Sequence, residues 1–238
     1  MFRFQRFTVH DDQCGHAVGT DGILLGAWAA CDQATRILDV GTGSGLIALM
    51  LAQRTEGRSD PPHIDAIETS TSAARQAAAN VAASPWADRI AVRGHSLEAH
   101  RQLCQAAAQT YDLVICNPPF FNMTQPANQE RALARHQCGL SLSELCVASR
   151  GLLSARGHLD VILPVNQYKV IQAEARPLMV KRQTLVHPKP NHAAKRVLLS
   201  LSGEDVELET DQLVLEVDKH QYTSAFKQLT AGFHLAHA

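Results

Sequence analysis

The fold is decided by the stretch Ile37-Leu38-Asp39-Val40-Gly41-Thr42-Gly43-Ser44-Gly45-Leu46, in which a short apolar run meets three glycines at alternate positions. The apolar run predicts a buried strand over 37–40, and the apolar residues that recur on a helical period predict a helix over 46–54. Alternating glycines between a strand and a helix let the backbone turn sharply and approach a ligand closely. The free N–H groups at the start of the helix favour a ligand there. The stretch therefore predicts a nucleotide-binding loop.

We assign Asp39, Gly41, Gly43 and Gly45 to cofactor binding on this pattern. Leucine at position 46 breaks the G-x-G-x-x-G spacing of pyrophosphate-binding dehydrogenases, which disfavours NAD. Glu68 follows the next apolar run, where one carboxylate can accept hydrogen bonds from both hydroxyls of a ribose. The alternative for Glu68 is an acid placed at the start of a helix; the glycine loop favours the ribose ligand.

Outward from this loop, short apolar runs alternate with helix-like stretches, the pattern of βαβ units and a parallel sheet. We expect an α/β, Rossmann-like fold with helices on both faces of the sheet. The expected strands cover 37–40, 63–67, 90–92, 112–116, 158–163, 184–186 and 197–201, and the expected helices cover 46–54, 72–83 and 141–151.

The two ends of the chain differ from this core. Residues 2–9 alternate apolar and polar side chains, which suggests a short strand or hairpin, and Thr20 or Asp21 is expected to cap a following helix. The tail predicts strands at 206–208 and 213–217 and a helix over 222–231. We expect one domain over 1–238, with extensions at 1–35 and 203–238 around a core at 36–202.

Composition restricts the class of protein. Of 238 residues, 45% are hydrophobic and 19% are charged, which is ordinary for a globular protein. No run approaches the roughly 18 apolar residues that a membrane-spanning helix needs, so we expect a cytoplasmic protein without a membrane partner. Six cysteines form no C-x-x-C pair and have no zinc-ligand spacing with the twelve histidines. We therefore expect reduced thiols and no metal.

A polar corner follows the strand expected at 112–116, in the sequence Asn117-Pro118-Pro119-Phe120. The prolines cannot continue a strand, so the corner is rigid and faces the crevice where open α/β sheets bind ligands. The side-chain oxygen of Asn117 and the carbonyl of Pro118 can accept the two protons of an exocyclic amine. Phe120 is then placed to stack on the ring of a base, and Phe121 is either a second platform or a core residue.

The glycine loop and the Asn-Pro-Pro-Phe corner, with an acid between them, resemble two motifs of the class I methyltransferases. A closer resemblance, to the bacterial tRNA(Val) adenine-N6 methyltransferases, is suggested by the stretches Val18–Trp28, 117–120, Gln129–Arg135 and Lys195–Leu199. The resemblance implies a seven-stranded sheet, S-adenosylmethionine as cofactor, and methylation of the adenine 3′ of the anticodon, position 37, in a tRNA partner.

One stretch departs from that family. Relatives usually have an acidic residue after the third strand that holds the amino group of the cofactor adenine, whereas this chain has Gly94-His95-Ser96. Recognition of the adenine must therefore differ. His95 or Ser96 is a candidate, and Ser96 is our choice among the cofactor-binding residues; a plain loop histidine is the alternative at 95.

The net charge of −1 gives no general attraction to RNA, so RNA contacts must come from local charge. Five cations and no acid lie within 181–196, among them Lys189, Lys195 and Arg196. With Arg131 and Arg135 these form the predicted substrate-binding set, the alternative being a solvated face.

Two other reactions suit the Asn117 corner: methylation of guanine N2 in ribosomal RNA, and methylation of a glutamine side chain in a protein. A third possibility is a binding module that has lost activity; the intact glycines, Glu68 and Asn117 disfavour it.

Overall fold

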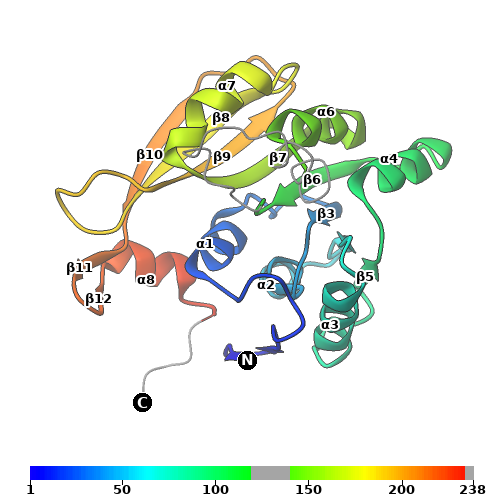
Figure 1. Cartoon of the computed structure of the whole chain (residues 1–238), viewed down its shortest axis with the longest axis horizontal. Coiled ribbons are helices and arrows are strands. Elements are labelled where there is room, and N and C mark those ends of the chain that lie inside the picture. Colours follow the sequence, from blue (N-terminus) through cyan, green and yellow to red (C-terminus); the bar gives the residue numbers. More distant parts are fainter. Residues whose placement is uncertain (119–139, 234–238) are drawn as a thin grey trace, which may run out of the picture.

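The computed structural model describes residues 1–118 and 140–233 (Figure 1). Its centre is an eight-stranded sheet with the strand order β10-β8-β9-β7-β6-β3-β4-β5. The bounds of its strands are β3 Arg36–Val40, β4 His63–Ile67, β5 Ile90–Arg93, β6 Tyr111–Cys116, β7 Leu153–Pro164, β8 Met179–His187, β9 Arg196–Ser202 and β10 Glu209–Val214.

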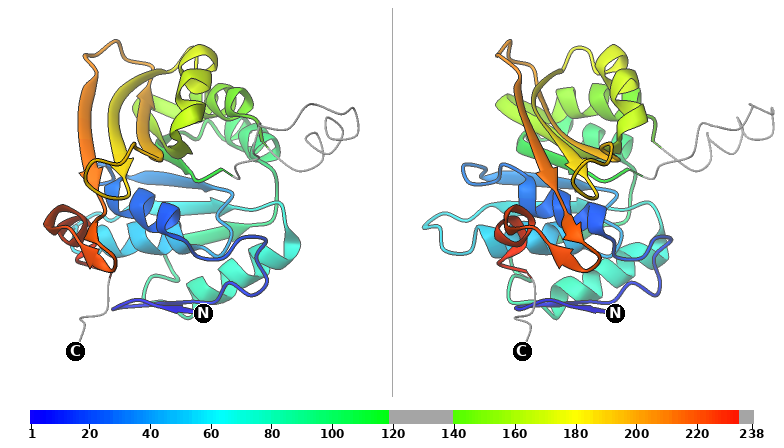
Figure 2. Two further views of the ribbon diagram at one scale, coloured as in Figure 1. Left: turned by 60° about the vertical axis from the view of Figure 1, so that its left-hand side comes forward. Right: turned by 90° about the vertical axis from the view of Figure 1, so that its left-hand side faces the viewer.

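Helices lie on both faces of this sheet (Figures 1 and 2). Several of them begin at a serine or threonine whose side chain accepts a hydrogen bond from the first turn, as Ser141 does in a complete capping box with Glu144. The helices are α1 Thr20–Trp28, α2 Leu46–Arg54, α3 Thr71–Ala82, α4 Leu97–Ala106, α6 Leu142–Leu152, α7 Tyr168–Glu174 and α8 Ser224–Thr230, and a 3-10 turn covers Val165–Gln167.

Two apolar cores form because successive side chains of a strand point to opposite faces. Ile37 and Ile115 belong to the core under α1 and α2, whereas Leu38 and Val114 belong to the core under α4 and α6. All four side chains are fully buried. Continuous apolar runs such as 113–116 are therefore required by a sheet that is covered on both faces.

The direction of β8 decides which loop reaches the edge of the sheet where the glycine loop lies. β9 runs antiparallel to both β7 and β8, so β8 is parallel to β7 and to the strands beyond it. The loop 188–195 after β8 therefore leaves from the same edge as the loops after β3, β4, β5 and β6. Residues 184–186, which are predicted as a strand, lie within β8, and its direction agrees with the parallel sheet expected from the sequence.

The chain ends pack against each other. Strands β1 Phe2–Arg3 and β2 Thr8–Val9 form the predicted hairpin, and the backbone N–H of Gln5 donates to the carbonyl of Phe233, 3.2 Å away (Figure 2). Near α8, β11 Glu216–Asp218 pairs with β12 Gln221–Tyr222. The N-terminal hairpin thus lies against the end of the described tail.

The Rossmann-like fold is confirmed, and several local predictions are wrong. The sheet has eight strands instead of seven because β10 adds in parallel to β8. The strand predicted at 206–208 is irregular chain, and that at 213–217 is divided between β10 and β11. Helix α1 is capped by Gly19 without a side-chain hydrogen bond, not by Thr20 or Asp21. Helix α4 has no counterpart among the helices named from the sequence.

Candidate functional site

Four parallel strands end in a row at one edge of the sheet. The register pairs Val40 with both Ile67 and Cys116, so Gly41 stands between Glu68 and Asn117. Ile67 pairs with Arg93, which adds Gly94 beyond Glu68. Because neighbouring strands are about 4.8 Å apart, the row spans roughly 14 Å. The structure thus brings the predicted glycine loop, acid and asparagine into one line.

The glycine loop has backbone angles that only glycine adopts without strain. Gly41, Gly43 and Gly45 have φ values of 68°, 55° and 82°. An added Cβ at Gly41 would meet no atom within 4 Å, so the loop leaves open space on that side. The alternating glycines are therefore required by conformation, and the space above them can take a ligand.

Asp39 lies below the loop and not on its surface. Its carboxylate accepts hydrogen bonds from the hydroxyl of Thr42, at 2.6 Å, and from the backbone N–H of Ala48, at 3.2 Å. Burial of this side chain, which is 1% exposed, raises the pKa of Asp39 to about 7, although both hydrogen bonds favour the charged form. Asp39 thus ties the loop to α2, and its predicted contact with the cofactor stays a prediction.

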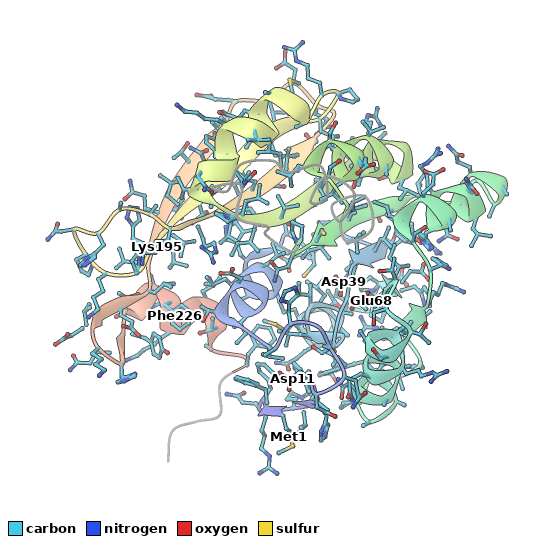
Figure 3. All side chains as sticks on the ribbon, in the orientation of Figure 1. Met1, Asp11, Asp39, Glu68, Lys195 and Phe226 are labelled. Carbon is cyan, nitrogen blue, oxygen red and sulfur yellow. The ribbon has the colours of Figure 1, made fainter. Side chains whose placement is uncertain are left out.

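Glu68 reaches back to the loop. Its carboxylate accepts the backbone N–H groups of Gly43, at 3.1 Å, and of Ser70, at 2.9 Å. Figure 3 labels Asp39 and Glu68 near each other at the centre of the molecule. Glu68 is partly exposed, whereas Asp39 is buried. Of the two acids, Glu68 is the one that a ligand in the loop can reach.

Asn117 lies against the first turn of α1. A Cβ added at Gly22 would come 3.9 Å from Nδ2 of Asn117 and 3.1 Å from Cδ2 of Leu46. Pro118 is buried and Asn117 is partly exposed. The predicted corner is therefore packed on one side, with the asparagine between α1 and the glycine loop. Phe120, Phe121, Arg131 and Arg135 lie outside the described residues.

The side chain of Ser96 caps a helix. It is the N-cap of α4, where its hydroxyl accepts the N–H of Ala99 at 3.2 Å. His95, next to it, directs its Nε2 atom at Nδ1 of His100, 2.9 Å away. Of the two candidates after the third core strand, the histidine is the one that belongs to a side-chain network.

The basic loop 188–195 is less free than its charge suggests. Nζ of Lys189 lies 3.5 Å from Oδ1 of Asp218, and Nε of Arg196 donates to Oδ2 of Asp21 at 2.8 Å. Lys195 is exposed, and Figure 3 shows it at the loop after β8, away from Asp39 and Glu68. The ion pair of Arg196 fastens β9 to α1, so Arg196 has a structural task that the sequence pattern did not indicate.

Asn80 is a residue that pattern reasoning missed. Its side chain donates to the carbonyls of His10, at 2.7 Å, and Ser44, at 2.8 Å, and accepts the N–H of His10 at 3.0 Å. It thereby holds the N-terminal segment beside the glycine loop. A single asparagine in an alanine-rich helix was the available signal.

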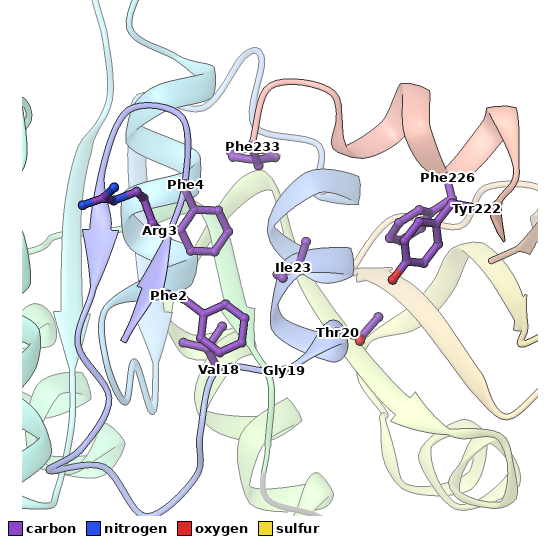
Figure 4. A pocket seen from close by; sticks show the side chains of 10 residues that line it. All are labelled: Phe2, Arg3, Phe4, Val18, Gly19, Thr20, Ile23, Tyr222, Phe226 and Phe233. Carbon is purple, nitrogen blue, oxygen red and sulfur yellow. The ribbon is translucent and has the colours of Figure 1, made fainter. Parts of the chain in front are cut away.

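A separate hollow lies between the N-terminal hairpin, α1 and α8 (Figure 4). Aromatic and aliphatic side chains line it, including Phe4, Ile23, Phe226 and Phe233. None of its lining residues belongs to the row of strand ends. It lies between the N-terminal segment, α1 and the tail, and is distinct from the candidate site.

Over residues 1–118 and 140–233, no group of His, Cys, Asp or Glu side chains is arranged to hold a metal ion. In the same residues, no helix has both the length and the apolar character needed to cross a membrane. The five cysteines in this part of the chain are free thiols, and four of them are buried.

Comparison with known proteins identifies the family of this chain. Residues 19–137 match the family described as methyltransferase small domain. A protein of Trichodesmium erythraeum named tRNA1(Val) (adenine(37)-N6)-methyltransferase is 42% identical over 99% of this chain and 98% of its own length. A protein of the same name from Parabacteroides distasonis is 41% identical, over 98% and 97% of the two chains.

Solved structures show the same fold. A predicted O-methyltransferase from Agrobacterium tumefaciens superposes with a TM-score of 0.68 at 22% identity, over 90% of this chain and 96% of that one. An O-methyltransferase from Bacillus cereus in complex with SAH superposes with a TM-score of 0.54 at 16% identity, over 79% and 83%.

Proposed function

Because this chain belongs to the methyltransferase small-domain family and to the tRNA1(Val) (adenine(37)-N6)-methyltransferases, we propose that it methylates N6 of adenine 37 in tRNA(Val) with S-adenosylmethionine. One observation carries the proposal: the register of β3, β4 and β6 aligns Glu68, Gly41 and Asn117 at one edge. A cofactor bound over the glycine loop would then extend from Glu68, whose carboxylate can accept ribose hydroxyls, toward Asn117, whose side-chain oxygen can accept a proton of the substrate amine.

The residues present fit this cofactor. The loop leaves open space at Gly41, and Glu68 carries the reachable carboxylate for the two ribose hydroxyls. Asp39 holds the loop from below through Thr42 and Ala48. When bound, S-adenosylmethionine supplies a methyl group on a positively charged sulfur atom.

Asn117 and Pro118 orient the nitrogen that is methylated. The lone pair of an aromatic amine is delocalised into the ring, which makes it a poor nucleophile. Acceptance of its two protons by the Asn117 side-chain oxygen and the Pro118 carbonyl favours a pyramidal nitrogen with its lone pair directed at the methyl group. The nitrogen would gain the methyl group as the bond from that carbon to the donor sulfur breaks, and it would release one proton to solvent. This is orientation and charge stabilisation, with no covalent enzyme intermediate.

The remaining substrate contacts rest on the sequence pattern. We place Phe120 as the stacking platform for the extruded adenine, with Phe121 as a second platform, and Arg131, Arg135, Lys189 and Lys195 as phosphate contacts. Lys189 can exchange its exposed partner Asp218 for a phosphate, since exposed ion pairs contribute little stability.

The test is methylation of an unmodified tRNA(Val) transcript by the purified protein, with isotopically labelled methyl donor and mass spectrometry of the digested nucleosides. We expect labelled N6-methyladenosine, and none from a transcript with guanine at position 37. Label in N2-methylguanosine of ribosomal RNA, or in glutamine of a protein substrate, with none in tRNA, would replace this proposal by one of the two other reactions.

A further inference from the structure

A chain of hydrogen bonds runs from a buried carboxylate to the edge of the site. Asp65 in the middle of β4 is 2% exposed and lies 2.8 Å from the hydroxyl of Tyr111, a fully buried residue. The same hydroxyl lies 2.7 Å from Nε2 of His100, and Nδ1 of His100 lies 2.9 Å from Nε2 of His95. Four side chains from β4, β6, α4 and the loop after β5 thus form one relay.

The charge of Asp65 sets the direction of this relay. Arg93 donates to Asp65 at 3.2 Å and Arg36 at 3.4 Å. Burial acts to raise the pKa of Asp65, but the hydrogen bonds from Tyr111 and Arg93 outweigh it, and the pKa is lowered. The carboxylate is therefore ionised and accepts only, so the hydroxyl of Tyr111 must be its donor.

The tautomers of both histidines follow step by step. Because the Tyr111 hydroxyl gives its proton to Asp65, its oxygen can only accept from its other partners. It accepts from Nε2 of Gln109, 2.7 Å away, and from His100, which must therefore carry its proton on Nε2. Burial lowers the pKa of His100 and of His95, so both rings are neutral. Nδ1 of a neutral His100 is then an acceptor, and His95 must donate from Nε2. Nδ1 of His95 is left with a lone pair.

The position of His95 in the fold indicates which part of a bound cofactor would face this lone pair. The strand order is β6, β3, β4, β5, and the N–H of Glu68 donates to the carbonyl of Arg93 at 3.1 Å. With the ribose at Glu68 and the reacting methyl group on the Asn117 side, the base on the other side of the ribose would lie over the end of β5. His95 is the second residue after that end.

We propose that Nδ1 of His95 accepts a hydrogen bond from the exocyclic amino group of the cofactor adenine, and that Asp65, Tyr111 and His100 hold His95 in the tautomer that does so. This inference rests on the proposed function, since it assumes an adenosyl cofactor. A carboxylate accepts hydrogen bonds in any orientation, whereas a neutral imidazole accepts only at the nitrogen without a proton. The fixed tautomer therefore makes Nδ1 of His95 an acceptor.

The test compares two ligands by titration calorimetry, S-adenosylhomocysteine and S-inosylhomocysteine. The inosine base has a carbonyl oxygen in place of the amino group, so it would face the lone pair of His95 with another acceptor. We expect the parent protein to prefer the adenosyl ligand by about tenfold to a hundredfold, the effect of one mismatched polar contact. His95→Ala should reduce this preference to below about threefold, and His95→Asp should retain it.

The matched control is His220→Asn. His220 is an exposed turn residue with a φ of 62°, which asparagine tolerates, and its replacement should leave both affinities unchanged. A second measurement needs no ligand: ¹⁵N shifts of the His95 ring should show Nδ1 without a proton and Nε2 with one. In Tyr111→Phe, or in His100→Gln if that variant folds better, this single tautomer should be lost.

The outcomes separate this inference from the proposed function. Retention of the adenosyl preference by His95→Ala, or a proton on Nδ1 in the parent, overturns the role of His95 while methylation of tRNA by the parent still stands. Failure of the parent to bind S-adenosylhomocysteine contradicts the proposed function itself.

Discussion

Gly22 in the first turn of α1 lies against Asn117 at the end of β6, although 95 positions separate them in the sequence. The nearest approach of an added methyl group would be 3.1 Å to Leu46 and 3.9 Å to the amide nitrogen of Asn117. A methyl group at position 22 would thus press on Leu46 and only touch Asn117, whereas a larger side chain there would reach further toward the amide of Asn117.

Gly22→Val should displace the Asn117 amide and lower the single-turnover rate of methyl transfer by about tenfold or more, because misplacement by about 1 Å is costly in an oriented reaction. Gly22→Ala should be milder, since Leu46 can shift by a few tenths of an ångström. Rapid-quench assays with saturating tRNA would measure both. Gly57→Val is the matched control, as no atom lies within 4 Å of an added Cβ there. Equal rates for Gly22→Val and the control would show that position 22 does not govern Asn117.

Asn117→Ala should lower turnover by about a hundredfold or more and leave cofactor affinity unchanged, because it removes a hydrogen bond that strengthens in the transition state. Single-turnover kinetics and calorimetry on the same preparation separate the two effects. Asn166→Ala, at an exposed position in the 3-10 turn after β7, is the control. A near-normal rate in Asn117→Ala would mean that the corner is structural.

Glu68→Ala should weaken binding of S-adenosylhomocysteine by about 1 to 3 kcal/mol, the contribution of hydrogen bonds to a charged acceptor. Loss of the acid also leaves the N–H of Gly43 without this acceptor, which loosens the loop. Calorimetry gives the affinity directly, and Glu207→Ala, an exposed acid in the chain before β10, serves as control. The ribose assignment fails if the affinity of Glu68→Ala equals that of the parent.

Replacing Lys189 and Lys195 together by alanine should weaken tRNA binding and reduce the slope of log affinity against log salt by up to about two units, one for each phosphate contact. Arg196 is left in place because its ion pair with Asp21 fastens β9 to α1. Filter binding over a salt series measures the slope, and a Lys169→Ala, Lys227→Ala double variant removes the same charge elsewhere. Identical slopes for parent and test variant would remove loop 188–195 from the RNA contacts.

Asp39→Asn should change how stability depends on pH. The pKa of Asp39 is raised to about 7 in the folded protein, from an ordinary value near 4, so the folded state holds this proton when the unfolded state has lost it. This residue therefore makes the parent less stable as pH rises from about 4 to about 7, by on the order of 1 kcal/mol per pH unit.

The variant should lack this contribution, and the difference in unfolding free energy between parent and variant should shift over that range and become constant above about pH 8. Urea unfolding of both proteins at several pH values measures this difference. The contributions of the histidines, whose lowered pKa values act in the opposite direction, cancel when the difference is taken. A difference that does not vary with pH would mean that Asp39 ionises normally in the folded protein.

The sequence by itself determined the fold class and the order of the core elements. Hydrophobic periodicity is a local property, so the strands at 37–40, 63–67 and 112–116 and the helix at 46–54 were predictable to within a residue. The glycine loop was predictable for the same reason, because its three positive φ values favour glycine, and the three glycines at alternate positions are visible in the sequence. The division into a core and two extensions stays a prediction.

What the tertiary structure decided depends on contacts between distant positions. The eighth strand, the packing of Gly22 on Asn117, the ion pair of Arg196 with Asp21 and the buried position of Asp39 have no local pattern. The relay through His100 and Tyr111 is the clearest case. A histidine after a strand is ambiguous in the sequence, because its tautomer is set by partners that only the packing of α4 on the sheet brings within hydrogen-bonding distance.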